Sequence, residues 1–162
     1  VPKFYFIVDR IDLLNQASHE FRSRGLIVHI ISSREDFAED IKSNEAIHND
    51  SGMPEITVVN IQKFKDDPDV VNSNDYALGL QRVYFLDEVH RSYNPKGSFL
   101  ANLNQSDPNS IKIGLTGTPL LGNDYNSRSL FGDYIHKYYY NAVPIIMHQY
   151  LLMKLLTHVV FV

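Results

Sequence analysis

Two adjacent carboxylates, Asp87 and Glu88, directly follow the apolar run Val83–Leu86. A short apolar run bounded by polar residues predicts a buried strand, so both carboxylates would emerge at its carboxyl end. Such a pair can serve nucleotide hydrolysis: Asp87 can hold hydrated Mg²⁺, and Glu88 can orient and polarise the attacking water. A bare Asp-Glu pair is more often a solvated acidic turn. Here the residues that follow it, His90-Arg91-Ser92, favour the hydrolytic interpretation.

A second turn with chemical potential, Thr116-Gly117-Thr118-Pro119, follows the apolar run Ile111–Leu115. Its two hydroxyl groups can hydrogen-bond to neighbouring carboxylates or to the backbone, and its glycine allows chains to approach closely. Alone, this turn would be an ordinary strand exit. Together with the acidic pair on another strand end, it indicates a shared site.

The elements that must position these residues alternate along the chain. Five apolar runs predict strands: Phe4–Val8, Ile27–Ile31, Ile56–Val59, Arg82–Leu86 and Ile111–Leu115. Polar loops are expected over Asn44–Pro54 and Lys65–Gly79. Strands that alternate with helices predict an α/β fold with a mostly parallel sheet, in which the loops after the strands meet at one edge. Ligands bind at that edge in open α/β sheets.

Helices are predicted in three of the intervening segments. Between the first two strands, the side chains of Ile11, Leu14, Ala17 and Phe21 recur on one helical face, with Asp9 as the expected cap and Gly25 at the end. Ser33 and Asp36 form a capping pair for a short helix around Phe37–Ile41. A further helix is expected around Ser98–Asn104.

The composition of the chain argues against several classes of function. The 162 residues carry a net charge of −4, which argues against a protein that coats polyanions generally, so any DNA contact must be local. Without cysteine there is neither a disulfide nor a thiolate metal site, as suits the cytoplasm. The seven histidines lack the spacing of zinc enzymes, and no serine-hydrolase elbow is present. The apolar stretch Val143–Val162 contains His148, Lys154 and His158, which disfavours a membrane span.

The motifs together resemble those of superfamily 2 helicases and translocases, and their longer strings resemble the R subunit of type I restriction enzymes. The strings are Asp87-Glu88-Val89-His90-Arg91-Ser92, Gly114–Pro119 and Phe131–His136, within a resemblance that covers roughly residues 3 to 140. The family usually has Ala where this chain has Val89, an apolar change that should leave the carboxylates in place.

The resemblance implies ATP and Mg²⁺ as cofactors, Asp87 and Glu88 as catalytic residues with Asp87 at the metal, and His90, Thr116 and Thr118 as coupling residues. Phe6–Arg10 and Thr57–Phe64 are similar to DNA-contacting motifs, which makes Arg10, Asn60, Gln62 and Lys63 candidate DNA ligands. Equally, Arg10 could pair with Asp12 or solvent, and residues 60–63 could be a plain strand exit. Double-stranded DNA and the specificity (S) and methyltransferase (M) subunits are the implied partners, with no membrane.

We therefore expect residues 1–141 to be an incomplete first RecA-like motor domain of the P-loop NTPase type, and residues 142–162 to be an apolar tail. The phosphate-binding loop Gly-x-x-x-x-Gly-Lys-Ser/Thr is not found in the sequence, so the isolated chain should hydrolyse ATP poorly. The parent would be a type I site-specific deoxyribonuclease with DNA-dependent ATPase activity. The alternatives are a motor fragment of another superfamily 2 helicase, or a non-catalytic remnant that binds DNA or a partner.

Overall fold

Seven strands and two longer helices are defined in the computed structural model, which describes residues 2–62, 79–87, 99, 103–104, 107–116, 131, 134–136 and 159–161. The strands are β1 (Lys3–Val8), β2 (Ile27–Ile31), β3 (Glu55–Asn60), β4 (Arg82–Leu86), β5 (Ile111–Thr116), β6 (Tyr134–His136) and β7 (Val159–Phe161). The helices are α1 (Ile11–Ser23) and α2 (Arg34–Lys42). Each of the five predicted strands is present, with its ends within one residue of the expected positions.

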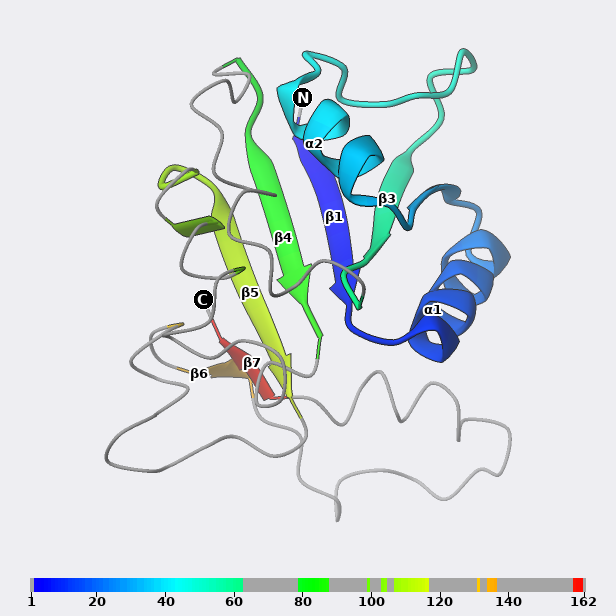
Figure 1. Ribbon diagram of the computed structural model, residues 1–162. Helices are drawn as coiled ribbons and strands as arrows, with labels where there is room; N and C mark the ends of the chain where they lie inside the picture. Colours follow the sequence, from blue (N-terminus) through cyan, green and yellow to red (C-terminus); the bar gives the residue numbers. More distant parts are fainter. Residues whose placement is uncertain are drawn as a thin grey trace.

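The strands form one sheet in the order β2-β3-β1-β4-β5-β7-β6 (Figure 1). The first five strands in this order are all parallel, whereas β7 runs antiparallel to β5 and β6 runs antiparallel to β7. The predicted α/β class with a mostly parallel sheet is therefore confirmed, as an incomplete RecA-like domain. The two short antiparallel strands at the edge carry no clear sequence signal and were not predicted.

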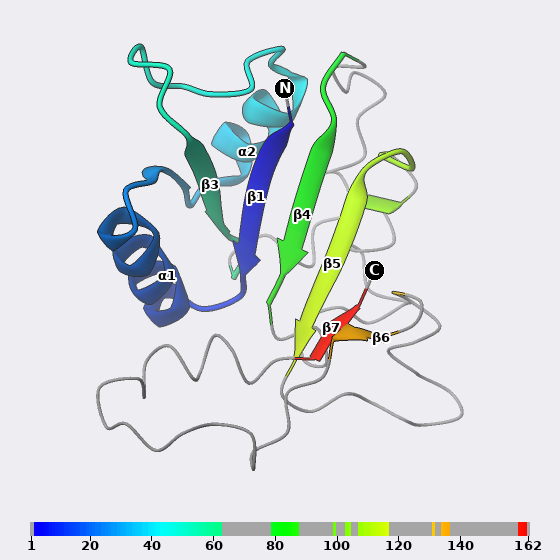
Figure 2. The same ribbon diagram turned by 180° about the vertical axis from the view of Figure 1, so that it is seen from behind.

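The sheet is covered on both faces. Alternate residues of β1 enter two separate cores: Phe6 and Val8 pack with Leu14 and Ala17 of α1, whereas Tyr5 and Ile7 pack on the side of α2. α2 lies in front of the sheet in Figure 1 and behind it in Figure 2, so it covers one face of the sheet. Burial on both faces explains why every residue of β1 after Lys3 is aromatic or aliphatic, and why Ile56, Val58 and Val59 of β3 lie in the core.

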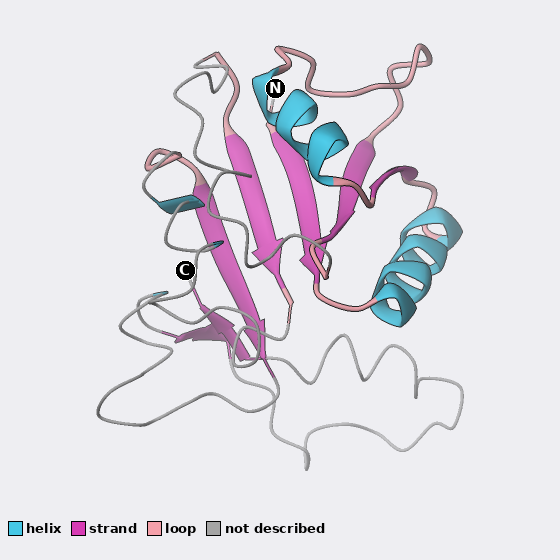
Figure 3. Ribbon diagram, in the orientation of Figure 1, coloured by secondary structure: helices cyan, strands magenta, loops and turns pink. Residues whose placement is uncertain are grey.

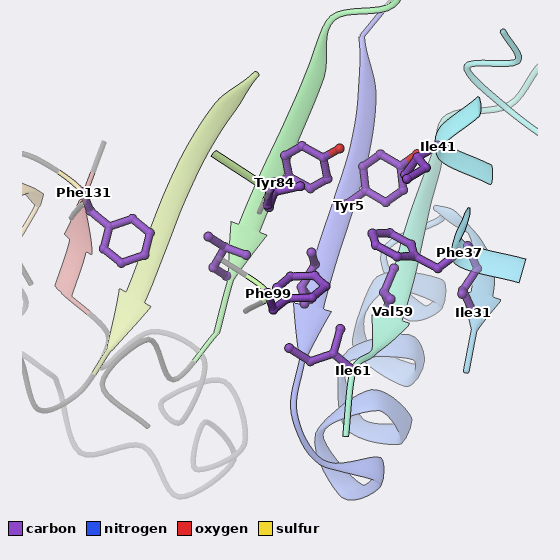
Figure 4. Close-up of a cluster of buried hydrophobic side chains, with 12 residues drawn as sticks. Tyr5, Ile31, Phe37, Ile41, Val59, Ile61, Tyr84, Phe99 and Phe131 are labelled. Atoms are coloured by element: carbon purple, nitrogen blue, oxygen red, sulfur yellow. The ribbon is translucent and has the colours of Figure 1, made fainter. Parts of the chain in front are cut away.

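The core on the α2 side is rich in aromatic rings (Figure 4). Tyr5 and Tyr84 stack with their ring centroids 4.9 Å apart, and Phe37 of α2 meets the Tyr5 ring edge-on at 6.1 Å. Phe99 and Leu103, from the segment predicted as a helix over Ser98–Asn104, are helical and buried in this core. The remaining residues of that segment, except Asn104, lie outside the described residues.

The start of α1 differs from the prediction. The cap is Arg10, because the first helical hydrogen bond runs from the amide of Leu14 to the carbonyl of Arg10. Arg10 has an extended backbone and makes no side-chain capping hydrogen bond. Asp9 lies one residue too early to cap. Ile11 is also 49% exposed, so the buried face of α1 begins at Leu14. Gly25 does end the helical segment, in a left-handed conformation (φ 85°).

The capping pair predicted for α2 is confirmed: the Ser33 hydroxyl accepts a hydrogen bond from the amide of Asp36 at 3.1 Å. The predicted loop after α2 runs across the amino ends of the strands before it enters β3 (Figure 3). Of the predicted loop Lys65–Gly79, only Gly79 lies within the described residues. Among the described residues, no helix has both the length and the apolar character needed to cross a membrane.

Candidate functional site

Four parallel strands end side by side at the carboxyl edge of the sheet. The registers pair Val8 with Asn60, Ile7 with Leu86, and Leu86 with Gly114. Two further backbone hydrogen bonds extend this alignment past the strand ends, from the Ile61 amide to the Val8 carbonyl (2.9 Å) and from the Asp87 amide to the Ile7 carbonyl (3.0 Å). The segments that follow β1, β3, β4 and β5 therefore start from one common edge, as predicted.

Asp87 and Thr116 reach this edge from neighbouring strands. Asp87 follows the last residue of β4 and is 4% exposed, and Thr116 is the last residue of β5 and is fully buried. Since Leu86 is paired with Gly114, Asp87 aligns with Leu115, and Thr116 is the next residue on the neighbouring strand. The ends of two neighbouring strands thus each carry a buried oxygen-bearing side chain, a carboxylate and a hydroxyl, and oxygen donors of this kind suit Mg²⁺ and its bound waters.

The described candidates for DNA contact differ in exposure. Arg10 is exposed at the start of α1, and Gln62 is exposed in the turn after β3. Asn60 is only 8% exposed, and its side-chain oxygen accepts a hydrogen bond from the Gln62 amide at 3.0 Å. This contact gives Asn60 a local role in shaping the strand exit. The other predicted site residues, Glu88, His90, Thr118 and Lys63, lie outside the described residues.

A second polar cluster, which the sequence did not predict, lies toward the amino edge on the α2 face. Its centre is the carboxylate of Asp40 on α2: Oδ1 accepts from Lys3 Nζ at 2.8 Å and lies 2.5 Å from His48 Nε2, and Oδ2 accepts from the Tyr5 hydroxyl at 2.7 Å. The other nitrogen of His48, Nδ1, lies 2.6 Å from Glu55 Oε1. We call these five residues the amino-edge network.

Two further side chains extend this network. The ring of His29 on β2 stacks on the ring of His48, with centroids 3.9 Å apart and planes at 12°. Asn49 donates from its side-chain amide to Glu55 at 2.9 Å. His29, Asp40 and His48 also line a cavity of about 320 Å³ that opens to solvent. Its wall holds further carboxylates from Asp36, Glu39 and Glu45.

The pKa shifts reflect this arrangement. Burial on its own raises the pKa of Asp40, but the hydrogen bond and the charge of Lys3 outweigh it and hold that pKa below its usual value. Burial likewise opposes ionisation of Glu55, yet hydrogen bonds from Asn49 and His48 lower its pKa. Desolvation and the neighbouring His48 lower the pKa of His29. Both carboxylates are therefore held ionised, and the His29 ring is held neutral.

Sequence reasoning missed the amino-edge network because its members share no local motif. They come from β1, α2, β3 and the loop before β3, and the packing of α2 on the sheet brings them together. One signal was available: Lys3, Glu55 and Arg82 each occupy the first position of a strand and are each followed by an apolar residue. A charged residue at three such positions indicates a polar layer at the amino edge.

Comparisons with known proteins agree with the resemblance drawn from the motifs. The model of the SWI2/SNF2 ATPase family matches residues 1–143. A protein of Methanocaldococcus jannaschii, named as a type I restriction enzyme MjaIXP endonuclease subunit, is 32% identical over 147 residues. That alignment covers 85% of this chain and 12% of the relative, so the chain spans about an eighth of the relative's length. No solved structure matches the chain significantly. On the extent of the family match, the chain belongs to the SWI2/SNF2 ATPase family.

Proposed function

We propose that this chain is part of the ATP-dependent DNA translocase motor of a type I restriction endonuclease R subunit. The observation that carries the proposal is the pairing of β4 with β5 at the carboxyl edge, where Asp87 follows β4, Thr116 ends β5, and both are buried. Membership of an ATPase family supports the nucleotide chemistry. The name of the archaeal relative supports the restriction-enzyme context.

ATP and Mg²⁺ are the proposed cofactors of this edge; when bound, they supply the phosphoryl group and neutralise the charge on its oxygens. Asp87 would hold the hydrated Mg²⁺ through its carboxylate. Its burial suits this task, because a carboxylate acts more strongly on a nearby cation where little water screens the charge. Glu88, the next residue, orients the attacking water and accepts its proton.

Coupling and DNA contact are assigned to the other strand exits of the same edge. His90, Thr116 and Thr118 link the state of the nucleotide to movement of the motor. Arg10, Gln62 and Lys63 contact the DNA backbone. The exposure of Arg10 at the start of α1 and of Gln62 in the turn after β3 supports this assignment. Asn60 supports them by fixing the turn that presents Gln62.

The proposed partners are double-stranded DNA and the specificity and methyltransferase subunits of a cytoplasmic restriction complex. In this assembly residues 1–141 form part of the first motor domain, and residues 142–162 form an apolar tail. The phosphate-binding loop and the nuclease centre belong to other parts of the R subunit. The isolated chain is accordingly expected to show no measurable ATPase activity.

The test is DNA-stimulated ATP hydrolysis by the R subunit in complex with its partners. Asp87→Asn and Glu88→Gln should each reduce the ATPase rate by about 10²–10⁴-fold, the usual contribution of positioned acid–base and metal-holding groups, while DNA binding is retained. The matched control is Asp12→Asn, an exposed carboxylate in the first turn of α1, which should leave the rate unchanged. Full ATPase activity in both edge variants would exclude the assignment.

Displacement of a third strand from duplex DNA measures translocation separately. Loss of displacement together with ATPase in Asp87→Asn supports a translocating motor. ATPase that depends on Asp87 but never displaces a strand, even in the wild-type complex, would contradict the translocase and leave another ATP-dependent function of the same edge.

A further inference from the structure

The amino edge carries a cluster of metal-ligating groups that has no part in the proposed motor chemistry. His29, Asp40 and His48 each offer one ligand atom, and these three atoms lie within 4.8 Å of one another. They come from β2, α2 and the loop before β3, and they line the open cavity of about 320 Å³. We propose that this cluster is a binding site for a divalent transition-metal ion of the Zn²⁺ class.

The donor set selects this class of ion. Two imidazoles and one carboxylate suit Zn²⁺ and its neighbours, whereas Mg²⁺ and Ca²⁺ prefer oxygen ligands alone. Zn²⁺ sites with three protein ligands keep a further position for water, and the cavity beside the cluster has room for it. Zn²⁺ here is therefore distinct from the Mg²⁺ proposed at the carboxyl edge.

His48 lies between two carboxylates, which is the arrangement of an imidazole that binds a metal with one nitrogen and a carboxylate with the other. Carboxylates only accept hydrogen bonds, so His48 bridges Asp40 and Glu55 when both ring nitrogens carry protons. When the ion binds, the Nε2–H bond breaks, the proton leaves to solvent, and the metal takes its place between Nε2 and Asp40 Oδ1. Nδ1 keeps its proton and donates it to Glu55. This carboxylate–histidine–metal arrangement fixes the orientation of a metal-bound ring.

The surroundings favour a cation in electrostatic terms. Asp36, Glu39 and Glu45 line the cavity with Asp40, and Glu55 stands behind His48. The opposing charge is Lys3, whose ammonium is already paired with Asp40. A cavity wall of one predominant sign raises the local concentration of the counter-ion. Asp40 has a second fixed contact through the Tyr5 hydroxyl, which holds the carboxylate in place.

The ligand atoms need a small adjustment. Bonds of about 2.0–2.2 Å place the ligand atoms of a tetrahedral Zn²⁺ site about 3.3–3.6 Å apart. The His29 and His48 rings, now stacked, have to turn toward a common point. Both rings are only partly buried and border the open cavity, which leaves space for this rotation. Because the ion would join β2, α2 and the loop, its binding should stabilise the folded chain.

The experiment uses the 162-residue chain after treatment with a chelator, and ZnCl₂ as the probe. Calorimetric titration should give one Zn²⁺ per chain, and the thermal midpoint should rise with Zn²⁺ concentration. His29→Gln, at a partly exposed position of an outer strand, should weaken binding at least about tenfold, and Glu55→Gln should weaken it about 10–100-fold as an orienting partner. His19→Gln, an exposed histidine on α1, is the matched control and should bind as wild type.

A spectroscopic readout on the wild-type chain keeps the test independent of variant folding. Nitrogen NMR of the histidine rings should show shifts of the His29 and His48 resonances on addition of Zn²⁺, with no such shifts on addition of Mg²⁺. Absence of Zn²⁺ binding by the folded wild-type chain would overturn the site, as would equal binding by wild type and His29→Gln. Neither result would affect the proposed motor, which is tested by Asp87 and Glu88.

Discussion

At the scale of single residues, the Lys3–Asp40 ion pair is almost completely removed from water. Its side chains are 1% and 5% exposed, and the charged atoms are 2.8 Å apart. Removing one charge of such a pair leaves the other buried without compensation, a cost of about 3–5 kcal/mol. We therefore expect Asp40→Asn to lower the free energy of unfolding by about this amount, measured by urea unfolding in the presence of a chelator.

The control for this prediction is the pair formed by Arg24 and Glu20 on α1. Its atoms are 3.7 Å apart, and Arg24 is 54% exposed. A long ion pair with an exposed arginine at the surface contributes about 0–1 kcal/mol, so Glu20→Gln should be nearly neutral. Equal losses in Asp40→Asn and Glu20→Gln would show that burial does not set the strength of the Asp40 contacts.

Asp87 and Asp40 show what a sequence can reveal about single residues. Asp87 was predicted because its neighbours in the chain, an apolar strand before it and Glu88 after it, already give it a chemical context. Asp40 has its context only in three dimensions, since Lys3, Tyr5 and His48 lie far from it along the chain or on other elements. In α2 it looks like an ordinary polar residue of an amphipathic helix.

At the scale of elements, the strands were predictable and the helix ends less so. A strand that is buried on both faces is mostly apolar, and this apolar run marks its limits in the sequence to within about a residue. The start of α1 was placed wrongly because an aspartate is a better cap than an arginine, yet here the chain takes its extended residue at Arg10. Strands β6 and β7, with three residues each, are too short to show any periodicity.

The turn that ends α1 supports a prediction about backbone strain. Gly25 has φ 85°, and a Cβ placed there would have no atom within 4 Å, so a substitution introduces strain but no clash. Gly25→Ala should lower the free energy of unfolding by about 1–2 kcal/mol.

Gly79→Ala is the matched control, because Gly79 has equal free space and no positive φ. At position 79 the alanine reduces the conformational entropy of the unfolded chain, so the free energy of unfolding should stay unchanged or rise by up to about 1 kcal/mol. Chemical denaturation of both variants measures the difference, and equal effects would exclude strain at Gly25.

At the scale of the whole molecule, the parallel strands separate two kinds of chemistry. The strands end at one edge in the residues proposed for nucleotide and DNA, and they start at the other edge in the amino-edge network. A six-residue strand such as β1 spans about 20 Å, and at that distance two unit charges interact by about 1 kcal/mol or less at an effective dielectric constant of about 20. Direct electrostatic coupling between the edges should therefore be weak.

The same sheet also separates two hydrophobic cores, which leads to a prediction about additivity. Leu14 of α1 packs on one face, and Ile41 of α2 packs on the other, in clusters that share no residue. Leu14→Ala should destabilise by about 2–5 kcal/mol and Ile41→Val by about 0.5–1.5 kcal/mol. Because the two sites have no common partner, the double variant should equal the sum within about 0.3–0.5 kcal/mol.

A pair within one core provides the contrast. Phe37 and Ile41 are one turn apart on α2 and belong to the same cluster, so Phe37→Leu combined with Ile41→Val should deviate from additivity by about 0.5 kcal/mol or more. Denaturant unfolding of the single and double variants measures both cycles. If the cross-sheet pair deviated as much as the pair on α2, the two cores would respond as one unit. Additivity across the sheet would instead mean that the sheet separates the two cores, so that the packing of each helix could be improved without affecting the packing on the opposite face.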